Sequence, residues 1–137
     1  MDDSVTIATS GGRVTLSDFA RPSRASEDWY SFRARIERSG LTAEAIVNDR
    51  GADSLPELFE EMHRDYQGWE GEKRWDAMEG ELSLTCTSDR LGHALIVARL
   101  QPDLYDSWSV EAHFQLDAGQ HQDIARHLRR LLERRAV

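Results

Sequence analysis

Seven stretches of this chain alternate apolar and polar residues with a period of two, which is the pattern of a half-buried β-strand. In the clearest of them, Leu82, Leu84 and Cys86 share one face. The segment 93–101 is apolar on both faces near its middle, which predicts a central place in a sheet. The seven stretches are residues 4–8, 13–16, 28–38, 41–48, 82–87, 93–101 and 108–116.

Short turns separate most of these stretches. Ser10-Gly11-Gly12 and Ser39-Gly40 each join two neighbouring stretches, and residues 88–92 join another pair. Such short connections are typical of antiparallel hairpins. Residues 18–27 contain Pro22 with several serines and alanines, and this composition predicts a loop.

Two stretches instead repeat apolar residues with the helical period of 3.6. The first helix is expected to start near Ser54 as its cap, with Pro56 in the first turn and Glu57 completing a capping box, and to end near Gly68. The second helix is expected over residues 118–134, with Asp117 as its cap. Its basic C-terminal end suits the negative end of the helix dipole.

These elements predict a single α+β domain over residues 1–137. It consists of an antiparallel sheet of about six to seven strands, with two amphipathic helices packed on one face or end. The other sheet face is expected to be partly exposed to solvent. Its predicted polar residues are Arg33, Arg35, Thr42, Glu44, Glu111 and His113.

The net charge of this chain limits the classes of partner that it can bind, and its cysteine content indicates its compartment. Its net charge of −8 argues against nucleic acid or an anionic membrane and permits a basic protein partner. Cys86 is the only cysteine, so an internal disulfide is excluded, and a cytoplasmic location is expected. No apolar run approaches a membrane span, and the acidic start, Met1 to Ser4, is not typical of a secretory signal. The chain is expected to be a monomer or a homodimer.

No catalytic, cofactor or metal motif stands out, so we predict none of these three kinds of site. The five histidines lack metal-binding spacing, and Cys86 lies on an apolar strand face, which favours core packing. His121 is expected to be a partly buried helix residue. Asp89 and His93 could form a polar dyad, but turn chemistry is the favoured interpretation.

The stretch Gly68 to Trp75, "GWEGEKRW", places two tryptophans among glycines and charges. It is interpreted as an anchored loop between a helix and a strand, with a binding rim as the alternative. Carboxylates crowd this loop and the helix before it, which suits attraction of a basic partner, although a solvated helix face explains the same composition. The candidate partner-binding residues are Glu60, Glu61, Trp69, Glu70 and Glu72.

From residue 68 onward the chain resembles a family of small, uncharacterised bacterial proteins. The shared pattern is GWxGxxxW, EGxLxL, DxxGH, WxV, AGQ and IA in order, and this chain departs from the family at Ala94, Asp117 and His121. The matching residues are Gly68, Trp69, Gly71, Trp75, Glu79, Gly80, Leu82, Leu84, Asp89, Gly92, His93, Leu95, Val97, Leu100, Trp108, Val110, Leu116, Ala118, Gly119, Gln120, Ile124 and Ala125. The resemblance implies no activity.

Three functions remain open, of which the last is a homodimer built on an exposed strand edge with a purely structural role. The first is a non-enzymatic protein-interaction module, in one form an immunity-type inhibitor that neutralises a basic, toxin-like protein; this rests on size, charge and layout. The alternative is a small-molecule binder or enzyme with a pocket between sheet and helices. That pocket would be lined by Tyr30, Trp108 and His113.

Overall fold

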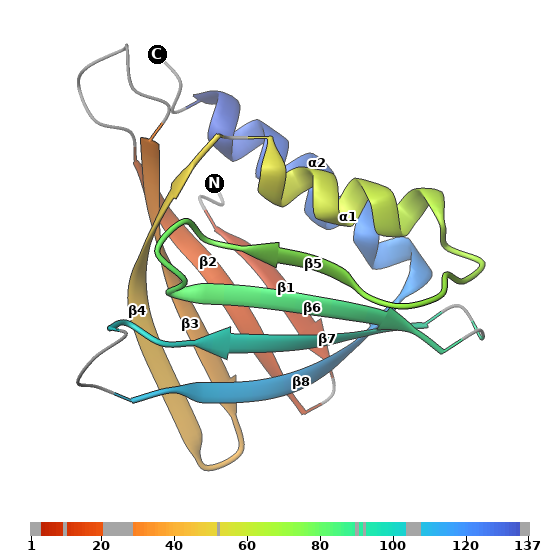
Figure 1. Ribbon diagram of the computed structural model, residues 1–137, viewed down its shortest axis with the longest axis horizontal. Helices are drawn as coiled ribbons and strands as arrows, with labels where there is room; N and C mark the ends of the chain where they lie inside the picture. The colour runs from red at the N-terminus through yellow and green to blue at the C-terminus, as the bar shows by residue number, and fades with distance from the viewer. Residues whose placement is uncertain are drawn as a thin grey trace.

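The computed structural model describes residues 4–9, 11–20, 29–51, 53–89, 91, 93–103 and 108–134. These residues form eight strands and two helices (Figure 1). The strands are Val5–Thr9 (β1), Gly12–Ala20 (β2), Trp29–Arg38 (β3), Leu41–Arg50 (β4), Lys73–Asp76 (β5), Leu82–Ser88 (β6), His93–Leu100 (β7) and Val110–Asp117 (β8). The helices are Ser54–Arg64 (α1) and Ala118–Arg134 (α2). Among the described residues, neither helix is long and apolar enough to cross a membrane.

The prediction of one sheet with six to seven strands is wrong. The strands form two separate four-stranded sheets, in the orders β1-β2-β3-β4 and β5-β6-β7-β8. All neighbouring strands are antiparallel, and β7 is central, as predicted. A period of two shows which face of a strand is apolar but not which strands pair. Two sheets that bury their apolar faces against each other therefore produce the same sequence pattern as one sheet covered by helices.

The two sheets lie face to face with their strands crossing steeply, and the helices lie side by side along one open side (Figure 1). Helix α1 contacts the edge strand β5, whereas α2 contacts β1 and β8. At the corners of the sandwich, β1 contacts β8 and β4 contacts β7. The helices therefore close the gap between the edge strands of the two sheets.

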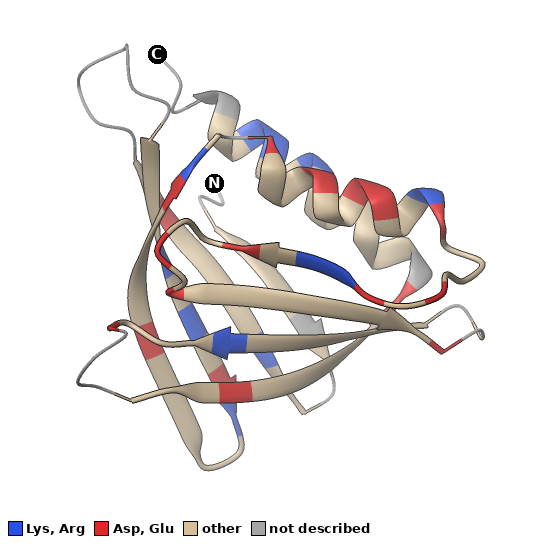
Figure 2. Cartoon of the chain, viewed as in Figure 1, with Lys and Arg blue, Asp and Glu red and all other residues tan. Residues whose placement is uncertain are grey.

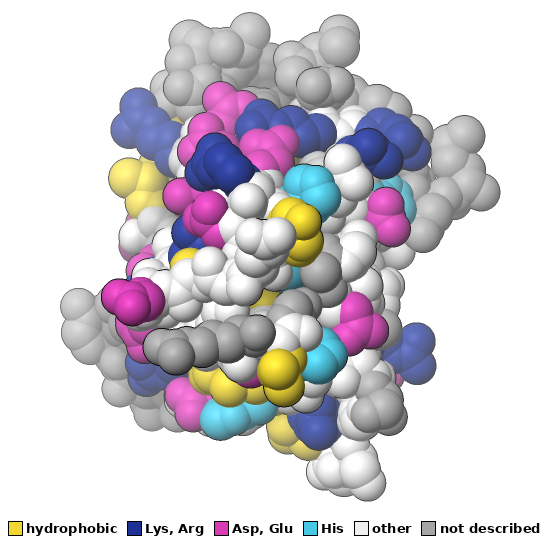
Figure 3. Space-filling view, turned by 90° about the vertical axis from the view of Figure 1, so that its right-hand side faces the viewer, with side chains coloured by type: hydrophobic (Ala, Val, Ile, Leu, Met, Phe, Trp, Pro, Cys, Tyr) yellow, Lys and Arg dark blue, Asp and Glu magenta, His cyan; other side chains and the backbone are white. Residues whose placement is uncertain are grey.

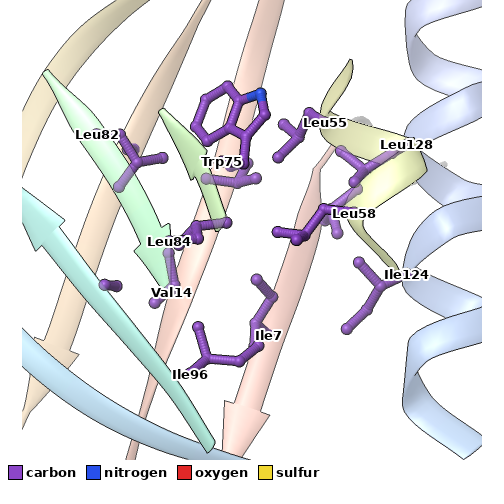
Figure 4. Packing of buried hydrophobic residues seen from close by; sticks show 14 of the residues in the cluster. Ile7, Val14, Leu55, Leu58, Trp75, Leu82, Leu84, Ile96, Ile124 and Leu128 are labelled. Atoms are coloured by element: carbon purple, nitrogen blue, oxygen red, sulfur yellow. The ribbon is translucent and has the colours of Figure 1, made fainter. Parts of the chain in front are cut away.

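One continuous apolar core joins both sheets and both helices (Figure 4). Val14 of the first sheet, Ile96 of the second and Leu55 of α1 are all completely buried in it. Trp75 projects from β5 toward the start of α1. Side chains from both sheets and both helices thus share one core.

Residues 73–76 form strand β5, where a loop was predicted. Trp75 lies opposite Leu84 of β6 and is only 5% exposed, so it is an anchor in the core. Before it, Gly68 and Gly71 have φ angles of +131° and +75°, which side chains rarely adopt. The stretch "GWEGEKRW" is therefore a turn that needs its glycines, followed by a short strand.

Several element boundaries also differ from the prediction. Helix α1 ends at Arg64 and not near Gly68, and β8 begins at Val110 and not at residue 108. Strand β2 continues to Ala20 across a bulge, and β4 continues to Arg50. The N-cap of α1 is Asp53, whose side chain makes no cap hydrogen bond. The Ser54 hydroxyl instead accepts a hydrogen bond from Trp75 Nε1 at 3.0 Å. It therefore helps to hold the core tryptophan.

Two buried carboxylates tie the end of β4 to the turn between β5 and β6. Asp49, 4% exposed, accepts hydrogen bonds from the Tyr30 hydroxyl and the Met78 backbone N–H, both at 3.0 Å. Glu81, 6% exposed, accepts one from the Asn48 backbone N–H at 3.0 Å. Burial raises the pKa of Asp49 above its ordinary value, and the hydrogen bonds it accepts oppose that shift. These contacts link the two sheets by polar groups as well as apolar packing.

Cys86 is expected to be unreactive in the folded protein. Its thiol is completely buried, and burial raises its pKa to about 12. Because the thiolate is the reactive form, a disulfide reagent at pH 8 should modify no cysteine in native buffer and one per chain in denaturant. Rapid labelling of the native protein, measured by absorbance, would contradict this placement.

Candidate functional site

The carboxylates of α1 and the loop after it form an acidic band, which we define as residues 53–72. This band contains seven carboxylates and one formally charged cation, Arg64. Figure 2 shows the acidic residues on α1 and along the loop that leads from it to β5. The structure divides these carboxylates into paired and unpaired groups.

Arg129 of α2 pairs with the acidic band. Its Nε and Nη2 atoms donate to the two Glu60 carboxylate oxygens at 2.9 and 2.8 Å, and its Nη1 donates to Asp53. The hydrogen bonds from Arg129 hold the pKa of Glu60 below its ordinary value. Glu60, a candidate partner-binding residue, is thus already occupied by a contact between helices.

Trp69 and Asp65 are engaged in a second internal contact. Lys73 donates to Asp65 at 2.8 Å, and its ammonium lies 5.3 Å from the centre of the Trp69 ring. Trp69 Nε1 also donates to the Cys86 carbonyl at 3.4 Å. The indole is half-buried against the core, so part of its surface is already covered by other residues of the chain.

The other acidic residues of the band face solvent. Glu57, Glu70 and Glu72 are exposed and make no ion pair with any residue that the structure describes. Glu61 forms an ion pair with the exposed Arg64 at 3.8 Å and with no other described residue. We call Glu57, Glu61, Glu70 and Glu72 the open carboxylates. Three of the five candidate partner-binding residues belong to this group.

A shallow hollow of about 400 Å³ lies among the open carboxylates of α1 and the Glu60–Arg129 pair. Glu57, Glu60, Glu61, Arg64 and Arg129 line it. We call it the acidic hollow. Because Arg129 binds the Glu60 carboxylate, this part of the hollow's lining has a defined position without a partner. In Figure 3, acidic and basic side chains lie close together in the upper part of the molecule, and histidine side chains lie in both its upper and lower halves.

The residues predicted to line a pocket between sheet and helices do not converge. Tyr30 is buried on the inner face of the first sheet, where it binds Asp49. His113 is exposed on the outer face of β8, and Trp108 is 41% exposed before that strand. These three side chains therefore do not form one site.

Asp89 and His93 have the geometry of a turn. Asp89 Oδ1 accepts from the Leu91 and His93 backbone N–H groups at 2.8 and 3.1 Å, and Oδ2 lies 2.8 Å from His93 Nδ1. The backbone hydrogen bond from Leu91 is the largest cause that lowers the pKa of Asp89. Among the described residues, no group of three or more His, Cys, Asp or Glu side chains could hold a metal ion.

His121 is more deeply buried than the sequence indicated. It is 1% exposed on the inner side of α2, and neither ring nitrogen has a hydrogen-bond partner within the described residues. Burial, with a smaller contribution from His63, lowers the pKa of His121 below its ordinary value. The sequence placed His121 beside Ile124 and Leu128 but could not show that α1 would bring His63 near it.

Acidification is expected to destabilise the fold through His121. Because its pKa is lower in the folded state, the unfolded chain binds more protons near pH 6, and stability falls as pH drops below about 6.5. The melting temperature of the wild type should therefore fall more between pH 7.5 and 5.5 than that of a His121→Leu variant. His113→Gln, an exposed control, should retain the wild-type slope. Equal slopes for the wild type and His121→Leu would refute this assignment.

Comparison with known proteins gives a family and a fold. The model of a family of unknown function, DUF6228, matches residues 5–135. A search of curated proteins found no match. Among solved structures, that of the plant transcriptional regulator PBF-2 is similar, with a TM-score of 0.50 and 7% identity over 94% of this chain and 79% of that chain. At this identity, the similarity extends to the fold alone.

Proposed function

We infer that this chain, which belongs to the DUF6228 family of unknown function, is a non-enzymatic protein-interaction module that binds a basic protein. One observation carries this proposal. Glu57, Glu61, Glu70 and Glu72 are exposed on one helix and its following loop. Within the described residues, only Glu61 of these four has an ion pair, a 3.8 Å contact with the exposed Arg64, whereas Glu60 and Asp65 are bound by Arg129 and Lys73.

The acidic hollow suits the side chain of a lysine or arginine. Glu57 and Glu61 lie one helical turn apart on α1, so a cation placed in the hollow lies near both carboxylates. An exposed ion pair contributes only about 0.2–1 kcal/mol, so binding needs several such pairs. Acidic surfaces also raise association rates with basic partners, and this effect weakens as salt increases.

The form of this function that we favour is an immunity-type inhibitor of a basic, toxin-like protein in the bacterial cytoplasm. Its support is the net charge of −8 and the single, buried, unpaired cysteine, which suits a reducing compartment. Such an inhibitor protects cells in which the basic partner is expressed. A variant with reversed open carboxylates should lose that protection.

Affinity capture from the source cells, followed by mass spectrometry, tests the proposal. The bait Glu57→Lys/Glu61→Lys reverses two open carboxylates. The matched control, Glu79→Lys/Glu111→Lys, reverses two exposed carboxylates elsewhere. Each double variant changes the net charge by the same amount, so their comparison separates local from overall charge.

The wild type and the control should recover the same basic protein, and the α1 variant should lose it. Salt near 0.5 M should release the protein from the wild type, because this concentration screens exposed charges strongly. Recovery of no basic protein, or equal recovery by all three baits, would contradict the proposed function.

A further inference from the structure

A second hollow, of about 290 Å³, lies between α1 and α2 on the other side of the Glu60–Arg129 pair. It is lined by Glu60, His63, Gln122, Ala125, Arg126 and Arg129. Its volume is near the lower end of the range for small-molecule sites. We call it the interhelical hollow, and its chemistry differs from that of the acidic hollow.

The uncompensated charge of the interhelical hollow is positive. Glu60 already accepts two hydrogen bonds from Arg129, so the wall that they form has little net charge. Arg126 is exposed and forms no ion pair with any described residue. A guanidinium with free N–H groups binds a carboxylate through two parallel hydrogen bonds. An anion is therefore the favoured occupant, even in a chain of net charge −8.

One side chain that lines this hollow is a histidine with a buried ring nitrogen. His63 lines it, and His63 Nδ1 is buried without a hydrogen-bond partner among the described residues. Because His63 Nδ1 is buried, a ligand in the hollow contacts other atoms of the His63 side chain.

The remaining lining favours a ligand that is partly apolar. Ala125 is 3% exposed, and the flat His63 ring can pack against a planar group. The Gln122 amide adds a neutral donor beside Arg126. A dianion such as phosphate would lie close to Glu60 and would gain nothing from Ala125. These features favour a monoanion with an apolar body over an inorganic anion.

We propose that the interhelical hollow binds a small organic monocarboxylate with a flat apolar body. Arg126 holds the carboxylate, Gln122 donates to it, and His63 and Ala125 contact the apolar part. This site is independent of the open carboxylates and of a protein partner.

Benzoate is a suitable probe, with the neutral isostere benzamide and inorganic phosphate as comparisons. Titration of each compound into the ¹⁵N-labelled full chain should show that benzoate alone shifts the backbone amide signals of His63, Ala125 and Arg126 in a saturable way. Arg126→Gln should weaken benzoate binding about tenfold, because one charge-assisted contact contributes roughly 1.5 kcal/mol or more. Arg130→Gln, an exposed neighbour outside the lining, and Glu57→Gln, in the acidic hollow, should bind as the wild type does.

Several outcomes would overturn the proposal. These are no saturable shift with benzoate, equal binding of benzoate and benzamide, tighter binding of phosphate, or unchanged benzoate affinity in Arg126→Gln. Circular dichroism of Arg126→Gln checks that the variant is folded, and Arg126→Lys, which keeps the charge but loses the two-bond geometry, should bind with intermediate affinity. A negative result in the benzoate titration would not change the result of the affinity capture, so each proposal can be rejected without the other.

Discussion

Replacement of Trp75 by alanine is expected to lower the free energy of unfolding by roughly 3–5 kcal/mol, the range for a buried aromatic side chain. Trp75 is 5% exposed and packs near Leu55 at the start of α1 (Figure 4). The variant would lose this packing, would leave a cavity between β5 and α1, and would remove the hydrogen bond from Nε1 to Ser54. Urea unfolding followed by circular dichroism measures the loss.

Trp69 supplies a control for the same chemical change. Its indole is only half-buried, with a long hydrogen bond to Cys86 and Lys73 over one face, so Trp69→Ala should cost clearly less. Trp75→Phe keeps most of the packing and loses the Ser54 contact, and should cost about 1–2 kcal/mol. A larger loss from Trp69→Ala than from Trp75→Ala would mean that the core anchor has been assigned to the wrong tryptophan.

Replacement of Asp49 by alanine is the second change with a large expected effect, about 3 kcal/mol or more. It removes the acceptor for the Tyr30 hydroxyl and for the Met78 backbone N–H, at a residue that is 4% exposed. A hydrogen bond to a charged group contributes about 1.5–3 kcal/mol, and Asp49 accepts one from each of these two donors. Chemical unfolding measures the change.

Asp49→Asn retains an acceptor oxygen, and its stability should lie between those of Asp49→Ala and the wild type. Asp76→Ala removes an exposed carboxylate that binds Arg74, and should change stability by less than about 1 kcal/mol. If Asp49→Ala were as mild as Asp76→Ala, the polar link between the sheets would not contribute to stability.

The strands with clear alternation were predictable from the sequence, whereas their grouping was not. Leu82, Leu84 and Cys86 indicated an inward face, and that face is buried. Strand β5 has four residues and one buried side chain, Trp75, so it shows no period of two. The division into two sheets depends on which strand edges meet, a property of the packed chain that no local pattern contains.

The sequence also showed that residues 53–72 are rich in carboxylates. It could not show which of these carboxylates are paired within the chain and which face solvent. Glu60 and Glu61 are neighbours with the same chemistry. Glu60 binds Arg129, which lies 69 residues away in sequence, and Glu61 faces solvent. Only the packing of α1 against α2 decides which of the two is available. The same packing creates both hollows, and no spacing within either helix indicates them.

The most direct test of the interaction proposal is a map of the partner's contacts on this chain. Amide shifts of the ¹⁵N-labelled protein should be recorded with and without the basic protein recovered by capture. The largest changes should fall in α1 and residues 65–72, and they should become smaller as salt is raised. Changes concentrated on the outer faces of β3, β4, β7 or β8, with α1 unaffected, would contradict it.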